Sequence, residues 1–337
     1  MDAKITKERL SRLFSFEWVK ILSCVLALIF GWLVIFELTE ARISPSQKFT
    51  VFNHMQNRAL VPDTIDKIDK ARQEDVFSYE VLKTDYQDLA QADLYAHTTL
   101  ESLLGVSDGD VILVPNNPNE LTKYEENGET KYKYTYPESL VNPYREYMTD
   151  LDPEKEGSYF YELEAYLNTF YTAGWENKDS IDTAKIEAAF RNRAKENKDK
   201  RYNTEKRIRA AIPLEIERIQ KYRDALEKFY GFLNEGLICF NERSSITDDT
   251  GMSTPYEGIL SVNICPDESK MRNLKQYFSY MVLEYDEAGE LTGSYRYSAK
   301  NMSVVFFYNP DMEKSFEYES LLYVVDLIEK GKTPVED

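Results

Sequence analysis

One continuous apolar run near the start of the chain constrains its fold more than any other feature. Residues 21–36 read ILSCVLALIFGWLVIF, and no comparable run occurs in the rest of the sequence. A bilayer core about 30 Å thick needs roughly 20 helical residues, and extension of the run to residues 18–39 supplies them. Lys20 and Glu37 then lie where each can reach an interface. We therefore predict a transmembrane helix over residues 21–39 that contacts the lipid bilayer.

The residues that precede this run set its orientation. The leader, residues 1–20, is net positive, with basic Lys4, Lys7, Arg9, Arg12 and Lys20 against acidic Asp2, Glu8 and Glu17. Positively charged flanks of a membrane helix stay in the cytoplasm. The sequence therefore predicts a single-pass cell-membrane protein with a cytoplasmic N-terminus, a spacer over residues 40–48 and an extracellular domain over residues 49–337.

Two alternatives compete with a retained anchor. Residues 39–41 (TEA) weakly resemble a cleavage site, but the apolar run is at or beyond the upper end of a signal-peptide core of about 7 to 15 residues. Residues 21–24 (ILSC) loosely resemble a lipobox. Cys24 is followed by further apolar residues, however, whereas a lipidated cysteine ends its apolar stretch. A retained helix is the interpretation that we favour.

The net negative charge of the exported part argues against nucleic-acid binding. Charges within residues 1–40 cancel, so the net charge of −18 belongs to the remainder of the 337-residue chain. An acidic surface repels nucleic acid and anionic lipid. The hydrophobic content of 42% is sufficient for a globular body. Cys239 and Cys265 lie in two predicted strands, and we favour two buried free thiols over the alternative of a disulfide.

The pattern after the spacer predicts alternating strands and helices. Strands are expected over residues 49–53, 77–82 and 110–114, with helices over residues 62–72 and 89–104 between them. Short links in a βαβαβ order demand a parallel sheet with right-handed crossovers.

The remaining chain is predicted to be helical in the middle and strand-rich at the end. An Asn-Gly turn at residues 127–128 indicates a hairpin. Helices are expected over residues 159–171, 183–198, 204–234 (with a bend or restart at Pro213) and 316–330, and strands over residues 237–240, 258–264, 280–285, 291–297 and 303–308. The basic stretch over residues 185–209 is interpreted as a solvated helix face. The alternative is a docking face for an acidic partner or a cell-wall polyanion.

The block over residues 49–115 carries a resemblance to a known family. It contains FSYEVLKTDYQDL and LYAHTTLESLLGVSDGDVILVP, in which Gly109-Asp110-Val111 leads into a strand. This block resembles the first lobe of bacterial extracellular solute-binding proteins of the periplasmic-binding-protein-like type II family. The resemblance covers about a fifth of the chain, and its motifs are loose.

The resemblance implies an α/β fold with mixed parallel sheets and a helical middle section, divided into two lobes. Lobe 1 would cover approximately residues 49–120 with part of the C-terminal region, and lobe 2 approximately residues 121–300. Members of the family capture a small polar solute, such as a sugar, between the lobes for an ABC transporter permease. A retained membrane helix departs from this pattern. The alternative is a cell-envelope scaffold or sensor with a degenerate fold that binds another protein.

Candidate ligand residues follow the predicted strands. Ligands of open parallel sheets bind beyond the carboxyl ends of the strands. These ends carry Asn53 with His54, Thr84 with Asp85, and Asn116. Such side chains offer mixed donors and acceptors for hydroxyls or a cationic group. The competing interpretation is turn chemistry, because loops also use Asn and Asp.

Aromatic residues crowd the middle of the chain, among them Tyr144, Tyr147, Tyr159, Tyr161, Tyr166, Tyr171 and Trp175. Aromatic faces attract cations, and they stack on sugar rings. The alternative is that these residues fill the buried face of a helix or an interface between lobes. Trp175, which follows Gly174 in a predicted loop, is the aromatic residue that we include in the candidate ligand site.

Catalytic motifs are missing from the sequence. Its two histidines, His54 and His97, lie far apart, and the nucleophile-elbow, zinc-protease and phosphate-loop patterns do not occur. We therefore predict a protein that is not an enzyme and that uses no cofactor and no metal.

Overall fold

The computed structural model describes residues 7–8, 11, 18–39, 47–53, 75–89, 96–106, 108–115, 121–126, 129–134, 147–196, 200–247, 253–285, 291–307 and 318–333. The chain divides into two compact units, Met1–Ile43 and Ser44–Asp337. The predicted helix over residues 62–72 lies outside the described residues.

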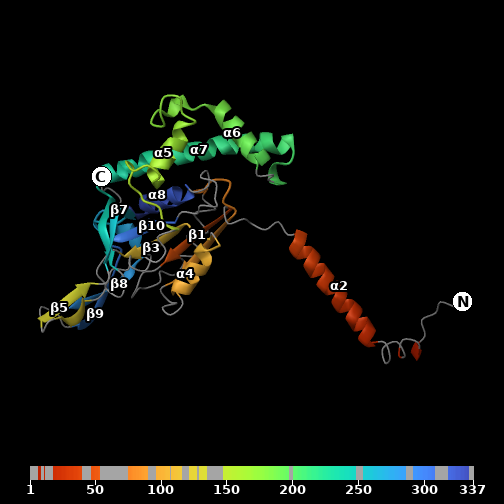
Figure 1. The fold of residues 1–337 in the computed structure, drawn as a ribbon, viewed down its shortest axis with the longest axis horizontal. Coiled ribbons are helices and arrows are strands. Elements are labelled where there is room, and N and C mark those ends of the chain that lie inside the picture. Colours follow the sequence, from red (N-terminus) through yellow and green to blue (C-terminus); the bar gives the residue numbers. More distant parts are fainter. Residues whose placement is uncertain are drawn as a thin grey trace. The chain divides into compact units, whose positions relative to one another are not determined.

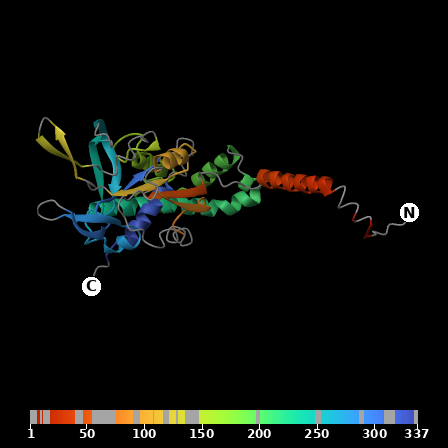
Figure 2. The ribbon, with the colours of Figure 1, turned by 90° about the horizontal axis from the view of Figure 1, so that it is seen from below.

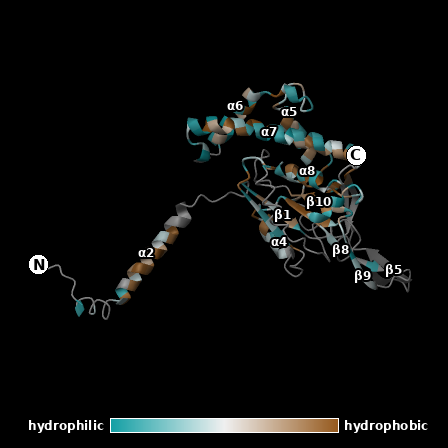
Figure 3. Cartoon of the chain, turned by 180° about the vertical axis from the view of Figure 1, so that it is seen from behind, coloured by the Kyte–Doolittle hydropathy of each residue, from teal (hydrophilic) through white to brown (hydrophobic). Residues whose placement is uncertain are grey.

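The first unit contains the helix α2, Trp18–Thr39, which is 22 residues long. Most of its side chains are apolar (Figure 3), and they are exposed, for example Phe30 at 66% and Trp32 at 67%. Among the described residues, no helix satisfies both the length and the hydropathy expected of a membrane span.

The second unit is built on a six-stranded mixed sheet with the order β2-β1-β3-β10-β7-β6 (Figure 1). The strands are β1 (Lys48–Asn53), β2 (Lys83–Asp88), β3 (Val111–Pro115), β6 (Cys239–Thr247), β7 (Ser253–Asn263) and β10 (Met302–Phe306). β1 pairs in parallel with both β2 and β3, whereas β10 is antiparallel to β3 and β7. The expected parallel arrangement of the first three strands is confirmed, and β2 and β6 are the outer strands.

The position of the second strand was predicted wrongly. The apolar segment over residues 77–82 forms turns and bends, and the strand is the polar segment KTDYQD that follows it. Phe77 packs on Phe49 with ring centroids 4.6 Å apart, and the Glu80 carboxylate binds Arg201. Polar and apolar residues of this segment are both buried, among them Phe77 and Glu80, so the segment is a loop that packs against the body. β2 tolerates polar residues because it is an outer strand.

Most other elements lie close to their predicted positions. The hairpins are β4 (Leu121–Glu126) with β5 (Glu129–Tyr134) and β8 (Tyr280–Tyr285) with β9 (Leu291–Ser298). The helices are α4 (Ala96–Leu104), α5 (Tyr159–Asn168), α6 (Thr183–Glu196), α7 (Glu205–Asn234) and α8 (Glu319–Gly331), with short 3₁₀ turns η3 (Lys178–Ser180), η4 (Lys200–Tyr202) and η5 (Arg272–Gln276). α7 continues through Pro213 without the restart that was considered.

Two apolar clusters cover the two faces of the sheet. On one face, Phe52, Ile112 and Val114 pack against Leu100 and Leu104 of α4. On the other face, the main core joins the sheet to α5, α7 and α8. Figures 1 and 2 both show α7 running alongside α8. Side chains alternate between the faces along β1, so Phe49 and Val51 point toward the helices and Phe52 points toward α4.

The C-terminal third joins the same sheet as the first three strands. β10 forms hydrogen-bonded ladders with β3 and with β7, and Ser44–Asp337 is one compact unit. The predicted division into two lobes near residue 120 stays a prediction. The structure has Cys239 and Cys265 as free thiols. Cys265 is buried, as expected, whereas Cys239 is exposed, so the expectation that both thiols are buried is wrong.

Candidate functional site

The carboxyl end of the sheet, where β1, β2 and β3 end, contains one of the predicted ligand residues. Asn53 is the last residue of β1, and its side chain is on the helix-facing side of the sheet. It is only 3% exposed, and its Nδ2 donates a hydrogen bond of 2.8 Å to the Tyr86 hydroxyl. Within the described part of the chain, the buried Oδ1 of Asn53 accepts no hydrogen bond. A buried acceptor without a donor is costly, and a ligand hydroxyl or amine would satisfy it.

Thr84 and Asp85 lie at the opposite end of the sheet, so the prediction that they join Asn53 is wrong. The register pairs Thr84 with Phe49 and Asp85 with Thr50, near the start of β1. The error follows from the displaced second strand, since β2 begins at Lys83 where the prediction had a strand end. His54 and Asn116 lie outside the described residues.

Asp85 instead belongs to a charged cluster at the amino end of the sheet, where the three parallel strands begin. The Lys48 ammonium lies 2.8 Å from Asp85 and 2.6 Å from Asp108. Burial would lower the pKa of Lys48, but the hydrogen bonds to both carboxylates outweigh it and raise that pKa. Burial would likewise raise the pKa of Asp85, and the Lys48 hydrogen bond holds it below its ordinary value.

Asp110 is the unusual member of this end of the sheet. Its Oδ2 accepts a hydrogen bond of 2.7 Å from the Thr50 backbone N–H. Burial disfavours the charged carboxylate and raises the pKa of Asp110 to about 8, despite the hydrogen bond from Thr50. Gly109 precedes it because a Cβ there would lie 2.5 Å from the Phe52 ring.

Trp175 lies in the predicted loop, but it is packed into the body. Its backbone N–H donates to Asn168 Oδ1 at 3.0 Å, its carbonyl accepts from Arg223 at 3.2 Å, and its ring lies 6.0 Å from that of Tyr230. The indole is buried among core residues. The alternative interpretation, that the middle aromatics fill a buried helix face, therefore describes Trp175 better than ligand stacking does.

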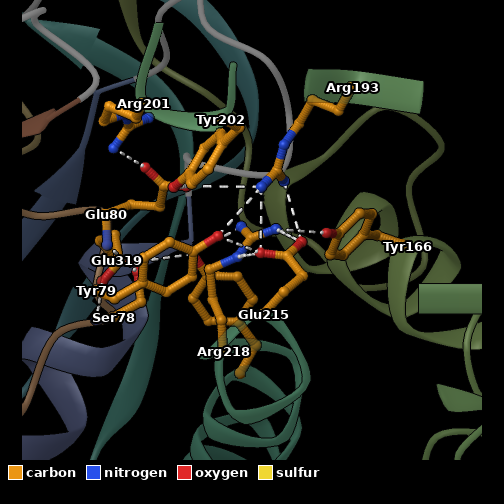
Figure 4. A network of polar contacts seen from close by, with 11 residues as sticks. Ser78, Tyr79, Glu80, Tyr166, Arg193, Arg201, Tyr202, Glu215, Arg218 and Glu319 are labelled. Carbon is orange, nitrogen blue, oxygen red and sulfur yellow. Dashed lines mark hydrogen bonds and ion pairs between the residues drawn. The ribbon is translucent and has the colours of Figure 1, made fainter. Parts of the chain in front are cut away.

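A buried polar network connects several helices with the loop of residues 78–80, and sequence reasoning missed it (Figure 4). Its centre is Glu215 of α7, whose carboxylate accepts two hydrogen bonds from Arg218 (2.5 and 2.9 Å) and two from Arg193 (both 3.1 Å). The Tyr79 hydroxyl donates a further bond of 2.8 Å to Glu215. Arg218 also donates to the Tyr166 hydroxyl at 3.2 Å.

A second part of the network holds the loop of residues 78–80. Glu80 is buried and binds Arg201 of η4 at 2.7 Å. Glu319, the first residue of α8, accepts from the Ser78 backbone N–H at 3.0 Å and from the Tyr222 hydroxyl at 2.6 Å. The network therefore connects α6, η4, α7 and α8 to the loop that leads into β2.

The ion pairs of the network keep its carboxylate and guanidinium groups charged. Burial would raise the pKa of Glu215, but Arg218 and Arg193 lower it to about 2. Arg218 is fully buried, and its neighbours raise its pKa above the ordinary value. Each guanidinium is already bound to a carboxylate in this geometry. We therefore interpret the network as a structural connection between layers.

The network revises the interpretation of the basic stretch over residues 185–209. Arg193 and Arg201 reach into the body and bind Glu215 and Glu80, so they are not part of a solvated face. Arg191 binds Glu205 in a bidentate pair with distances of 2.9 and 3.0 Å. A signal was present, because Glu215 and Arg218 fall on the apolar stripe of α7 that contains Ala211, Ile219, Tyr222, Leu226 and Phe229.

No group of three metal-ligating side chains occurs among the described residues. Comparisons with known proteins add no assignment, since no family model, no curated protein and no solved structure matches the chain. The resemblance to solute-binding proteins therefore stays a prediction.

Proposed function

We propose that the protein is a single-pass membrane protein whose residues 44–337 form an extracellular binding domain without catalytic activity. The observation that carries this proposal is the contrast between α2 and the body. α2 exposes large apolar side chains such as Phe30 and Trp32, whereas the body has its own core. A helix of 22 residues is about 33 Å long, which is close to the thickness of a bilayer core.

Fractionation and protease accessibility test the anchor. We expect the full chain to stay with membranes after an alkaline carbonate wash, and a C-terminal tag on intact cells to be cut by added protease. A matched variant with Leu28→Arg and Phe30→Arg places two charges in the apolar run and is expected to be released by the same wash. Release of the unchanged protein would contradict the anchor.

We further propose that the domain binds a small polar solute at the carboxyl end of the sheet. Three parallel strands end there, which is the usual ligand position in open α/β sheets. The buried Asn53 Oδ1 supports this site, and the Tyr86 hydroxyl lies beside it. A thermal-shift screen of sugars, amino acids and polyamines is expected to identify a stabilising ligand. The shift should disappear in Asn53→Ala.

A second candidate function is a scaffold that binds another envelope protein. Tyr295 and Tyr297 favour it, because both are exposed on β9 and their rings meet edge to face at 5.6 Å. Exposed tyrosines are enriched at protein interfaces. The absence of any thermal shift, together with a co-purified partner that is lost in Tyr295→Ala/Tyr297→Ala, would favour the scaffold.

A further inference from the structure

The ribbon formed by β8 and β9 has one face toward the body and one face open to solvent. Met281 lies opposite Tyr297 in the register, and Tyr295 is two residues away on β9, so the three side chains share a face. Tyr280 and Val282, at the alternate positions of β8, pack against the main core. Figures 1 and 2 show the ribbon on the side of the body opposite the start of α7. Tyr295 is 56% exposed and Tyr297 is 41% exposed, so this tyrosine face (Met281, Tyr295 and Tyr297) is accessible to a partner.

Hydrogen bonds at the base of the ribbon hold it on the body. The Glu268 carboxylate accepts from the Ser298 hydroxyl at 2.9 Å and from the Ala299 backbone N–H at 2.7 Å. On β8, the Tyr280 hydroxyl donates to the Lys300 carbonyl at 2.6 Å. A two-stranded hairpin alone is only marginally stable in water. These bonds therefore keep the tyrosine face in place before a partner arrives, which lowers the entropic cost of binding.

The sequence of the ribbon is acidic. Against one basic residue, Arg296, residues 280–298 contain four acidic ones, Glu284, Asp286, Glu287 and Glu290. Arg296 alternates with Tyr295 and Tyr297 along β9, so it lies on the other face, where it is 3.7 Å from Glu268. None of the cation–π contacts among the described residues involves Tyr295 or Tyr297. The tyrosine face therefore presents aromatic rings beside net negative charge, with the one cation of the ribbon turned away.

We propose that the tyrosine face binds a segment of another protein that is rich in arginine and lysine. The inference rests on the scaffold function proposed above and names the chemistry of its partner. Aromatic faces attract guanidinium and ammonium groups. The acidic residues of the ribbon raise the local concentration of a cationic segment. An anionic partner would be repelled by the same residues, and a neutral apolar partner would gain nothing from them.

Peptide binding to the full chain in a non-ionic detergent tests the inference. The probe is a dye-labelled peptide of alternating arginine and glycine, and in the control peptide glutamine replaces arginine. We expect fluorescence anisotropy to show about tenfold tighter binding of the arginine peptide. Tyr295→Phe/Tyr297→Phe keeps both aromatic faces and should retain this binding. Tyr295→Leu/Tyr297→Leu keeps apolar side chains but removes the rings, and it should weaken the binding about tenfold.

The matched control is Tyr161→Leu, which makes the same change at a tyrosine of α5 that is 39% exposed and should leave the binding unchanged. None of these substitutions alters the net charge, so a general attraction of the peptide to the acidic chain would survive all of them. Equal binding of the two peptides, or equal binding by the Phe and Leu variants, would overturn the inference. The scaffold function would still stand if a co-purified partner were lost in Tyr295→Ala/Tyr297→Ala, so the two failures are distinguishable.

Discussion

At the amino end of the sheet Lys48 pairs with Asp85 and Asp108, whereas at the carboxyl end Asn53 and Asn263 make neutral hydrogen bonds to Tyr86 and Asn301. At the charged end, the Lys48 ammonium is paired with carboxylates. Among the helices, Glu215 is likewise paired with Arg193 and Arg218. The carboxyl end retains a buried acceptor, Asn53 Oδ1, that no described residue satisfies, and it also holds the side chain of Asp88, which is opposite Asn53 in the register. We therefore expect the amino end to contribute to stability, and the carboxyl end is the ligand site proposed above.

The largest expected effect is at the centre of the charged network. Arg218→Met removes a fully buried guanidinium and leaves Glu215 buried with only part of its compensation. Breaking a buried pair in this way costs about 3–5 kcal/mol of unfolding free energy. Urea unfolding followed by circular dichroism measures it. The control Arg209→Met breaks an exposed pair with Glu205 and should cost less than about 1 kcal/mol. Equal urea midpoints for the two variants would show that the buried network contributes no more to stability than an exposed ion pair does.

A smaller loss is expected at Lys48. Lys48→Met leaves the Asp85 and Asp108 carboxylates without their shared cation, and we expect a cost of about 1–3 kcal/mol. The pKa of Asp85 is held below its ordinary value of 3.8, so its contribution is present above that pH and is lost as the pH falls through the folded-state pKa. The difference in urea midpoint between the wild type and Lys48→Met should therefore be smaller at pH 3 than at pH 7. Lys270→Met, at an exposed position, is the control.

Asp110 should give the amino end an opposite pH dependence. Its pKa is raised to about 8, so the folded state holds the proton more tightly than the unfolded state does. This contribution to the free energy of unfolding decreases as the pH rises from about 4 to about 8 and is constant above that range. Asp110→Asn keeps an acceptor for the Thr50 N–H and should flatten the dependence. Parallel stability curves for the two proteins between pH 5 and pH 8 would show that Asp110 does not titrate there.

The smallest effect on stability is expected at the carboxyl end. Asn53→Ala removes one neutral hydrogen bond to Tyr86 and also an unsatisfied acceptor, so we expect a change of less than about 1 kcal/mol. The same variant should lose any ligand-induced thermal shift completely. A thermal shift that survives the substitution would place the ligand elsewhere and would contradict the proposed ligand site at the carboxyl end.

Much of the fold could be predicted because local signals agreed with tertiary packing. Thr204 caps α7 by accepting from the Arg207 N–H, Gly331 ends α8, and the continuous apolar segment over residues 111–114 forms a strand buried on both faces. β2 could not be located in this way. Its residues are polar because it is an outer strand, while the apolar alternation of residues 77–82 serves a loop that packs on Phe49.

The candidate site was less predictable than the fold. Asn53 could be identified, since it follows an apolar strand directly, and its position at the strand end depends only on β1. The positions of Thr84 and Asp85 depended on the second strand and were lost with it. The partners of Glu215 come from residues as distant as Tyr79 and Arg193, and no local pattern specifies such pairings.

The polar composition of β2 has a consequence for the membrane anchoring proposed above. Tethered chains meet in two dimensions, where copies collide with similar orientations more often than free chains do. An outer strand offers unpaired backbone groups to a neighbouring copy, and charged side chains oppose such pairing. Lys83, Asp85 and Asp88 place such charges on β2, so we expect them to oppose the joining of sheets between neighbouring copies.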